Sequence, residues 1–105
     1  MIRVTLRPLD FLALRDVIRP IDVLLRRGWS PRYHCGDVYR GECPIHRSTS
    51  RSSRVFSCQS RVWYCHKCRR GGDAVRLYAL LEGLSDLAAA HILCEMFGVP
   101  KPYLP

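Results

Sequence analysis

Two closely spaced ligand pairs constrain the fold of this 105-residue chain more than any other feature. Cys43 and His46 form the first pair, Cys65 and Cys68 form the second, and eighteen residues separate them. A two-residue gap lets both side chains of one turn reach the same ion, and a second such turn completes a tetrahedral set. Three thiolates and one imidazole favour Zn²⁺ over magnesium or calcium, although iron accepts the same ligand types. The spacing therefore predicts one closed zinc site with a structural role.

Other cysteines and histidines compete with these four residues as ligands. Cys35 and Cys58 are rival thiols, and His34 and His66 are rival imidazoles. His66 lies inside the second turn, so we expect its side chain to point away from the metal. Cys94 falls on the apolar side of an expected helix and is predicted to lie in the core. The N-terminus does not resemble a secretory signal, so we expect a cytoplasmic protein whose cysteines outside the zinc site are free thiols.

Hydrophobic periodicity and turn residues divide the chain into four segments. These are an N-terminal helical segment (8–28), a zinc ribbon (33–72), a helix pair (73–98) and a tail (99–105). Together they predict one α+β domain over residues 1–105, with a small antiparallel sheet flanked by N-terminal helices and a C-terminal helix pair. No stretch is long and apolar enough to suggest a transmembrane helix.

Individual residues mark the expected elements within these segments. The first helical segment has two apolar runs separated by Pro20: Leu9, Leu12, Leu14 and Val17, then Ile21, Val23, Leu24 and Leu25. Three short strands are expected at Val38-Tyr39, Val55-Phe56 and Arg61-Val62-Trp63-Tyr64. Asp73 and Ser85 are expected to cap the two later helices, which Gly83 and Gly98 end.

Positive charge is concentrated on the predicted ribbon. The net charge of +8 suits a polyanionic partner such as nucleic acid. Between Cys43 and Asp73 no Asp or Glu occurs, but seven basic residues do: Arg47, Arg51, Arg54, Arg61, Lys67, Arg69 and Arg70. We predict that these residues contact nucleic acid, although a simply solvated basic surface is the alternative.

Aromatic residues are interspersed among these cations. Alternation along the last strand sends Trp63 and Tyr64 to opposite faces, so one of them can face outward. We expect Phe56 in the core and Trp63 among the nucleic-acid contacts, with packing of Trp63 under the zinc as the alternative. Because aromatic rings stack on unpaired bases, single-stranded DNA is the preferred partner, and duplex DNA and RNA stay open.

Several ordered motifs carry a resemblance to a known family. They are Tyr39-Arg40-Gly41-Glu42-Cys43-Pro44-Ile45-His46, Trp63-Tyr64-Cys65-His66-Lys67-Cys68, Gly71-Gly72-Asp73 and Leu81-Glu82-Gly83-Leu84-Ser85. In this order they resemble the zinc-binding domain of bacterial and phage DNA primases, over roughly residues 9–99. The resemblance implies a module that recognises single-stranded template during primer synthesis in DNA replication.

The chain departs from that family pattern at three places. The basic stretch 47–54 stands where the family has an acidic residue followed by Lys-Thr-Pro-Ser, His66 replaces a usual aromatic residue, and Arg69 replaces a usual glycine. Preference for a particular template sequence therefore does not carry over.

The resemblance covers a binding module and not a polymerase. The chain stops at Pro105, where family primases continue into a catalytic domain, and it has no cluster of carboxylates for two-metal chemistry. We therefore expect no enzymatic activity from this chain alone. It would act with a separate primase, polymerase or helicase subunit, as on a phage or mobile element. The alternatives are a DNA-binding regulator and a protein-interaction module that share the fold and its structural zinc.

Overall fold

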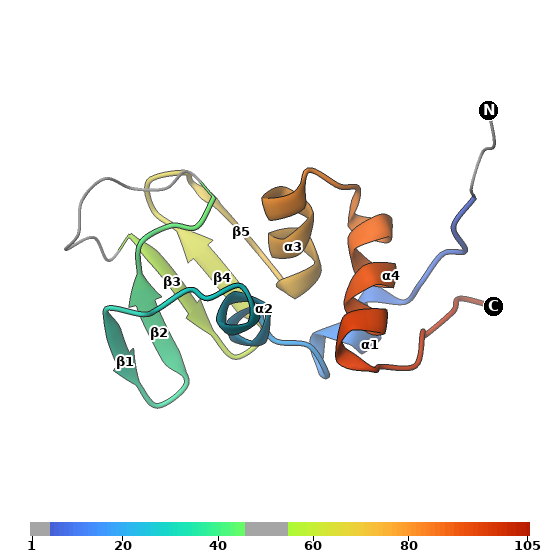
Figure 1. The fold of residues 1–105 in the computed structure, drawn as a ribbon, viewed down its shortest axis with the longest axis horizontal. Helices are drawn as coiled ribbons and strands as arrows, with labels where there is room; N and C mark the ends of the chain where they lie inside the picture. The colour runs from blue at the N-terminus through green and yellow to red at the C-terminus, as the bar shows by residue number, and fades with distance from the viewer. Residues whose placement is uncertain (1–4, 46–54) are drawn as a thin grey trace.

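A five-stranded antiparallel sheet forms one end of the molecule in the computed structural model, which describes residues 5–45 and 55–105. The strands follow one another in chain order as a meander; one helix lies against the sheet and the others occupy the opposite end (Figure 1). The strands are β1 (Tyr33–Cys35), β2 (Val38–Gly41), β3 (Phe56–Gln59), β4 (Val62–Cys65) and β5 (Arg70–Gly72). The predicted α+β class, with a small antiparallel sheet and flanking helices, is confirmed.

The sheet is wider than the sequence predicted. Strands β2, β3 and β4 overlap the three expected segments, although β3 shares only Phe56 with its segment, and β1 and β5 were not foreseen. All three residues of β1 are exposed, and β5 consists of Arg70 followed by two glycines, so neither strand carries the alternating apolar pattern that identifies a strand. Gly71 is required here, because a Cβ atom at this position would lie 2.7 Å from the backbone oxygen of Trp63.

Two short helices precede the sheet, α1 (Phe11–Arg15) and α2 (Pro20–Arg26). Asp10 begins α1 by accepting a hydrogen bond from the backbone N–H of Leu12 at 3.0 Å. Pro20 occupies the first turn of α2, where its missing N–H costs nothing. It therefore separates the two helices, as predicted.

Three apolar residues of the two N-terminal runs do not reach the core. Leu12, Val17 and Leu25 are 67%, 57% and 55% exposed. For Val17 the reason is that α1 ends at Arg15, so Val17 lies in the connection beyond it and the helical period does not carry through to α2. Leu9, Leu14, Ile21, Val23 and Leu24 are buried.

The two C-terminal helices, α3 (Ala74–Glu82) and α4 (Asp86–Phe97), have the predicted ends. Asp73 and Ser85 accept hydrogen bonds from backbone N–H groups of the first turns, and Gly83 and Gly98 end the helices in the left-handed conformation. No single helix in the described residues is long and apolar enough to cross a membrane. Together α3 and α4 satisfy that test by length and composition, but they are bent by 105°.

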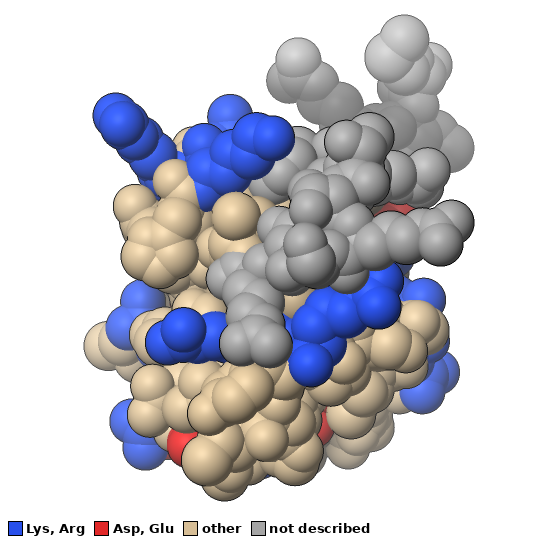
Figure 2. Space-filling view, turned by 90° about the vertical axis from the view of Figure 1, so that its left-hand side faces the viewer, with Lys and Arg blue, Asp and Glu red and all other residues tan. Residues whose placement is uncertain are grey.

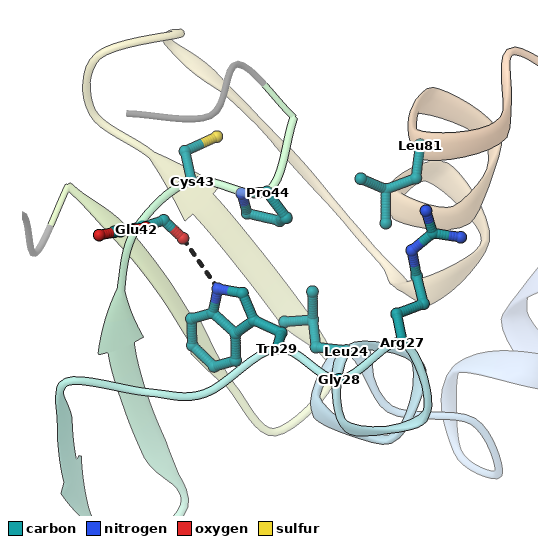
Figure 3. A pocket seen from close by; sticks show the side chains of 8 residues that line it. All are labelled: Leu24, Arg27, Gly28, Trp29, Glu42, Cys43, Pro44 and Leu81. Atoms are coloured by element: carbon teal, nitrogen blue, oxygen red, sulfur yellow. Dashed lines mark hydrogen bonds between the residues drawn. The ribbon is translucent and has the colours of Figure 1, made fainter. Parts of the chain in front are cut away.

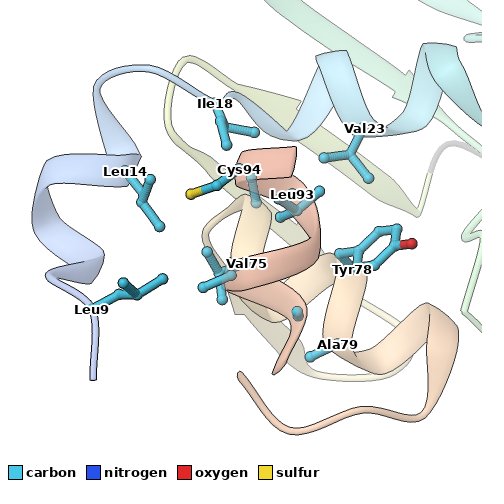
Figure 4. Packing of buried hydrophobic residues seen from close by; sticks show 12 residues of the cluster. Leu9, Leu14, Ile18, Val23, Val75, Tyr78, Ala79, Leu93 and Cys94 are labelled. Carbon is cyan, nitrogen blue, oxygen red and sulfur yellow. The ribbon is translucent and has the colours of Figure 1, made fainter. Parts of the chain in front are cut away.

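Two hydrophobic clusters stabilise the chain, and α3 contributes to both. The first joins α1, α3 and α4 around residues such as Leu14, Val75 and Leu93 (Figure 4). Cys94 is buried in it, which confirms its predicted place in the core. The second lies between the sheet and helices α2 and α3, and it contains Phe56 and the cysteines of the metal centre. The sheet end and the helical end are therefore packed through one shared helix.

Phe56 provides a direct test of the second cluster, because its side chain is completely buried on β3. Phe56→Ala is expected to lower the free energy of unfolding by about 3–5 kcal/mol, since it removes a large core side chain and leaves a cavity. Val62→Ala is the matched control, because Val62 lies on the neighbouring strand and is exposed. It should change stability by no more than about 0.5 kcal/mol. Urea denaturation of the zinc-loaded protein measures both, and equal losses would contradict this assignment of the core.

Candidate metal centre

Three cysteine sulfurs converge at one side of the sheet. Cys43 follows β2, Cys65 ends β4, and Cys68 lies in the turn that leads into β5. Their sulfur atoms lie within 4.8 Å of one another, and those of Cys43 and Cys68 are 3.8 Å apart. Two sulfurs bound at about 2.3 Å to one tetrahedral zinc ion are separated by about 3.8 Å. The distance between the Cys43 and Cys68 sulfurs therefore fits two ligands of one zinc ion, and the Cys65 sulfur lies close enough to join them.

The second turn is shaped by hydrogen bonds to Cys65. The backbone N–H of Cys68 donates to the Cys65 sulfur at 3.3 Å, and the N–H of Arg69 donates to the Cys65 carbonyl at 2.8 Å. Burial by itself would raise the pKa of the Cys65 thiol, but hydrogen bonds from its neighbours outweigh that effect and lower the pKa. Cysteine binds zinc as the thiolate, so a thiol that ionises readily is suited to be a ligand.

The fourth predicted ligand, His46, lies outside the described residues. Within residues 5–45 and 55–105, the group of potential ligands contains only Cys43, Cys65 and Cys68. None of the rival ligands that the sequence raised belongs to it.

Each rival side chain has another environment. Cys58 is buried on β3, and this burial raises the pKa of its thiol to about 12, so it stays protonated. His34 stacks on Tyr39 with 4.2 Å between the ring centroids. His66 is exposed and packs edge-on against Tyr64 at 5.0 Å. The described residues thus bring together the three predicted cysteine ligands and none of their rivals, while His46 stays a prediction.

Aromatic rings pack in the same hydrophobic cluster as the cysteines of the metal centre. Phe56 lies between Trp29 and Trp63, each with its ring centroid 5.7 Å away. The Trp29 indole N–H donates to the backbone oxygen of Glu42 at 2.9 Å, which fixes the segment directly before Cys43 (Figure 3). The sequence analysis did not identify this role of Trp29. A Trp that follows a helix-ending glycine and precedes the first ligand pair was the available signal.

A shallow hollow of about 340 Å³ lies beside Cys43 (Figure 3). Leu24, Trp29 and Leu81 line it, and Arg27 stands at its rim in an ion pair with Glu82. The hollow adjoins Cys43, and its one acidic lining residue, Glu42, contacts Arg32 at 3.3 Å and is not grouped with the cysteine sulfurs. It has no evident part in metal binding.

Trp63 does not occupy the position predicted for a nucleic-acid contact. It is only 2% exposed, and its indole N–H donates to the Asp73 carbonyl at 2.8 Å. Its ring faces are covered by the core, so it cannot stack on a base, and the prediction is corrected. The alternation of β4 turns Tyr64 outward instead, and Tyr64 is 42% exposed.

The predicted basic residues divide into three groups. Arg47, Arg51 and Arg54 lie outside the described residues. Arg61 forms an ion pair with Asp16 at 2.8 Å, which places it at the junction with α1. Lys67, Arg69 and Arg70 are exposed, and none of them has an acidic partner in the described part of the chain.

Charge pairing explains why the remaining cations gather on the sheet. Seven of the nine acidic side chains are held in ion pairs. Asp10 caps α1 and Asp37 accepts from Ser60. Arg7 and Arg26 lie over aromatic rings. Among the described cations this leaves Arg40, Lys67, Arg69 and Arg70 without such partners, all in the sheet or its turns. The end of the molecule seen in Figure 2 is correspondingly rich in Lys and Arg, with little acidic surface.

The sequence matches a known protein family over most of its length. The model of the CHC2 zinc finger matches residues 14–104. The DNA primase of Rickettsia bellii is 32% identical over 91 residues, which cover 87% of this chain and 14% of that protein. The DNA primase of Aquifex aeolicus is 35% identical over 63 residues, or 60% of this chain and 12% of that protein.

A solved structure agrees with these relatives. The crystal structure of the zinc-binding and RNA polymerase domains of Aquifex aeolicus primase aligns with a TM-score of 0.70 and 27% identity. The alignment covers 92% of this chain and 23% of that one. The chain therefore spans only a small part of the length of its relatives. With three converging cysteines and this family match, the site holds a structural zinc ion. The chain belongs to the CHC2 zinc finger family and corresponds to the zinc-binding domain of DNA primases.

Proposed function

We propose that this chain is the template-binding module of a DNA primase system and that it binds single-stranded DNA through its zinc ribbon. Membership of the CHC2 zinc finger family supports a role in DNA replication. One observation supports the binding itself. The sheet presents an outward face that combines two exposed tyrosines with an arginine that has no acidic partner in the described fold.

The outward face follows from the register of the sheet. Residues directly opposite one another in antiparallel strands point to the same side. Tyr33 pairs with Arg40, Arg40 with Ser57, Ser57 with Tyr64, and Tyr64 with Gly71. We call this row the open face: Tyr33, Arg40, Ser57, Tyr64 and Gly71.

The chemistry of the open face suits a single strand. Tyr33 and Tyr64 are 41% and 42% exposed, so their rings are accessible to unpaired bases. Arg40 lies between them without an acidic partner and can hold a phosphate. A duplex hides the faces of its bases, so the tyrosines favour a single strand over a duplex.

Zinc has an indirect part in this proposal. Cys43, Cys65 and Cys68, with His46 as the proposed fourth ligand, would join the end of β2 to the end of β4 and the turn before β5. This linkage holds the strands that carry Arg40 and Tyr64 in register. Four protein ligands leave no position for water, so the ion would have a structural role.

Polymerisation is assigned to another part of the system. Every acidic side chain of the described fold either caps a helix, accepts a hydrogen bond from Ser60 or pairs with a cation, so none is grouped for two-metal chemistry. We therefore propose that nucleotide transfer occurs in a polymerase domain or subunit that works with this module. A helicase is a further candidate partner, and the cytoplasm is the proposed location.

The open face is tested by substituting Arg40 and Tyr64. Tyr64→Ala is expected to weaken single-strand binding by about 1–3 kcal/mol, because one stacked base is lost. Arg40→Ala should reduce the magnitude of the slope of log K against log salt concentration by about 0.7, because one phosphate contact to a single strand contributes that amount. Fluorescence anisotropy with single-stranded DNA, duplex DNA and RNA measures these changes.

The control for these variants is Arg26→Ala, which removes a positive charge from α2, away from the open face. It should bind as the unaltered protein does. If neither Tyr64→Ala nor Arg40→Ala alters affinity or its salt dependence, single-strand binding by the open face is wrong. A preference for duplex DNA would instead favour a DNA-binding regulator.

The metal site is tested by ligand substitution and chelation. Binding of such structural zinc is on the order of 10–16 kcal/mol, which is comparable to or larger than a typical stability of about 5–15 kcal/mol. Chelation should therefore abolish the near-UV CD signal of the buried Trp63 and half-buried Trp29 and unfold the ribbon. Cys65→Ser and His46→Ala should each bind less than one equivalent of zinc, whereas the control Cys35→Ser should keep a full equivalent. Full zinc content in His46→Ala would exclude His46 as a ligand.

A further inference from the structure

Arg69 has an unusual backbone conformation. Its φ angle is +56°, and Ser60 is the only other described residue besides glycine with a positive φ. This left-handed conformation crowds a Cβ atom, so glycine adopts it freely and arginine does not. The turn that carries Cys65 and Cys68 requires this left-handed conformation, because the Arg69 N–H donates a hydrogen bond to the Cys65 carbonyl there. Residues that keep such strain are frequent at functional sites, so the Arg69 side chain is a candidate for a functional role.

The Arg69 side chain borders a hollow of about 460 Å³ between β5 and α3. Its lining consists of Arg69, Arg70, Gly71, Arg76 and Leu80, and includes no acidic residue. Arg69 and Arg70 have no acidic partner in the described fold. Arg76 has one long contact, 3.4 Å to Asp86. Three arginines therefore line one small hollow, and in the described fold Asp86 is the only acidic side chain that any of them contacts.

The strand β5 holds Arg76 in place through its glycines. A Cβ atom at Gly72 would lie 3.0 and 3.1 Å from the Cβ and Cγ atoms of Arg76, so the stem of Arg76 lies directly against this strand. Packing of the stem restricts where the guanidinium group can reach. The hollow is therefore a formed feature of the β5–α3 junction, which Figure 1 shows at the inner edge of the sheet.

The hollow is continuous with the open face at Gly71. Gly71 lines the hollow and pairs with Tyr64, and a Cβ atom at Gly71 would lie 2.8 Å from the Tyr64 ring. β5 is also the edge strand of the sheet. A nucleic-acid strand whose base stacks on Tyr64 would thus reach the hollow where it leaves the sheet.

We infer that this hollow binds a phosphate group that carries more than one negative charge, such as the terminal phosphate of a strand on the open face or the phosphates of a free nucleotide. An internal phosphodiester carries a single charge, whereas a phosphomonoester carries about 1.5 to 2 at neutral pH. Guanidinium groups bind such oxygens in pairs, and three of them match a terminal phosphate or triphosphate better than a phosphodiester. If the phosphate is the end of a DNA strand, the inference rests on the proposed function. If it belongs to a free nucleotide, the inference does not.

A second role for these arginines has to be separated from this one. Three thiolates around Zn²⁺ leave a net negative charge, and Arg70 is close enough to lower the pKa of the Cys68 thiol, although burial raises that pKa overall. If the arginines only balanced the thiolates, their removal would weaken zinc binding and leave phosphate binding unaltered. Zinc content is therefore measured on every variant.

The experiment compares single strands that differ only at the 5′ end. A strand labelled at its 3′ end carries a 5′-hydroxyl, a 5′-phosphate or a 5′-triphosphate, and anisotropy gives the affinity of each. The zinc-loaded protein should bind the triphosphate end about tenfold more tightly than the hydroxyl end, the gain from one charge-assisted hydrogen bond network. Arg69→Asn keeps a residue that tolerates a positive φ but removes the charge. It should abolish this preference without lowering the melting temperature, and Arg76→Ala should also reduce it.

Controls and competitors separate the possible outcomes. Arg26→Ala and Ser60→Gly should retain the preference, because they change a remote charge and the other strained residue. Inorganic triphosphate is added as a competitor of the 5′-triphosphate strand. If it displaces the strand from the unaltered protein but not from Arg69→Asn, a free polyphosphate is a ligand of the hollow. If it does not displace the strand, the ligand is the strand end. Equal affinity for all three ends would overturn the inference, while binding of the hydroxyl strand would still support the open face. Loss of zinc in Arg69→Asn with an intact end preference would also overturn it.

Discussion

The convergence of three thiols between β2, β4 and β5 is the interaction on which the sheet depends. The strands are three or four residues long, and much of the sheet is exposed on its outward side. Such short strands bury little apolar surface, so the sheet has few other sources of stability. In the register of the strands, Phe56 on β3 lies opposite Gly41 on β2 and opposite the ligand Cys65 on β4. Metal binding and the packing of Phe56 therefore stabilise the same part of the sheet.

Helix α3 connects this metal-dependent sheet to the rest of the chain. Leu77 faces the cluster beneath the sheet, while Val75 and Tyr78 face the cluster shared with α1 and α4. At the helical end acidic side chains pair with nearby cations, as Arg15 with Asp73 and Lys101 with Glu95 illustrate. The sheet has fewer acids for its arginines. The same division of packing and charge thus produces a helical end that is largely balanced and a sheet end that is open to an anionic ligand.

Sequence reasoning predicted the parts of the fold that depend on local chemistry. The caps Asp73 and Ser85, the terminating glycines and the ligand spacing each act within a few residues. It failed where tertiary contacts decide. Only the strand pairing shows that Trp63 faces inward and Tyr64 outward, and only the fold brings Asp16 to Arg61. Strand β5 was missed because Arg70 and two glycines pair through the backbone, and a backbone pairing leaves no side-chain pattern.

The most direct test of the central claim is a map of backbone amide chemical shifts during titration of the zinc-loaded protein with a single-stranded oligonucleotide. Binding by the open face predicts that the largest changes occur at Arg40, Ser57, Tyr64 and Gly71, on four adjacent strands, and that the amides of α4 stay unchanged. Changes confined to α1 and α4, or no changes at concentrations where the strand binds, would contradict the claim that the zinc ribbon holds the template.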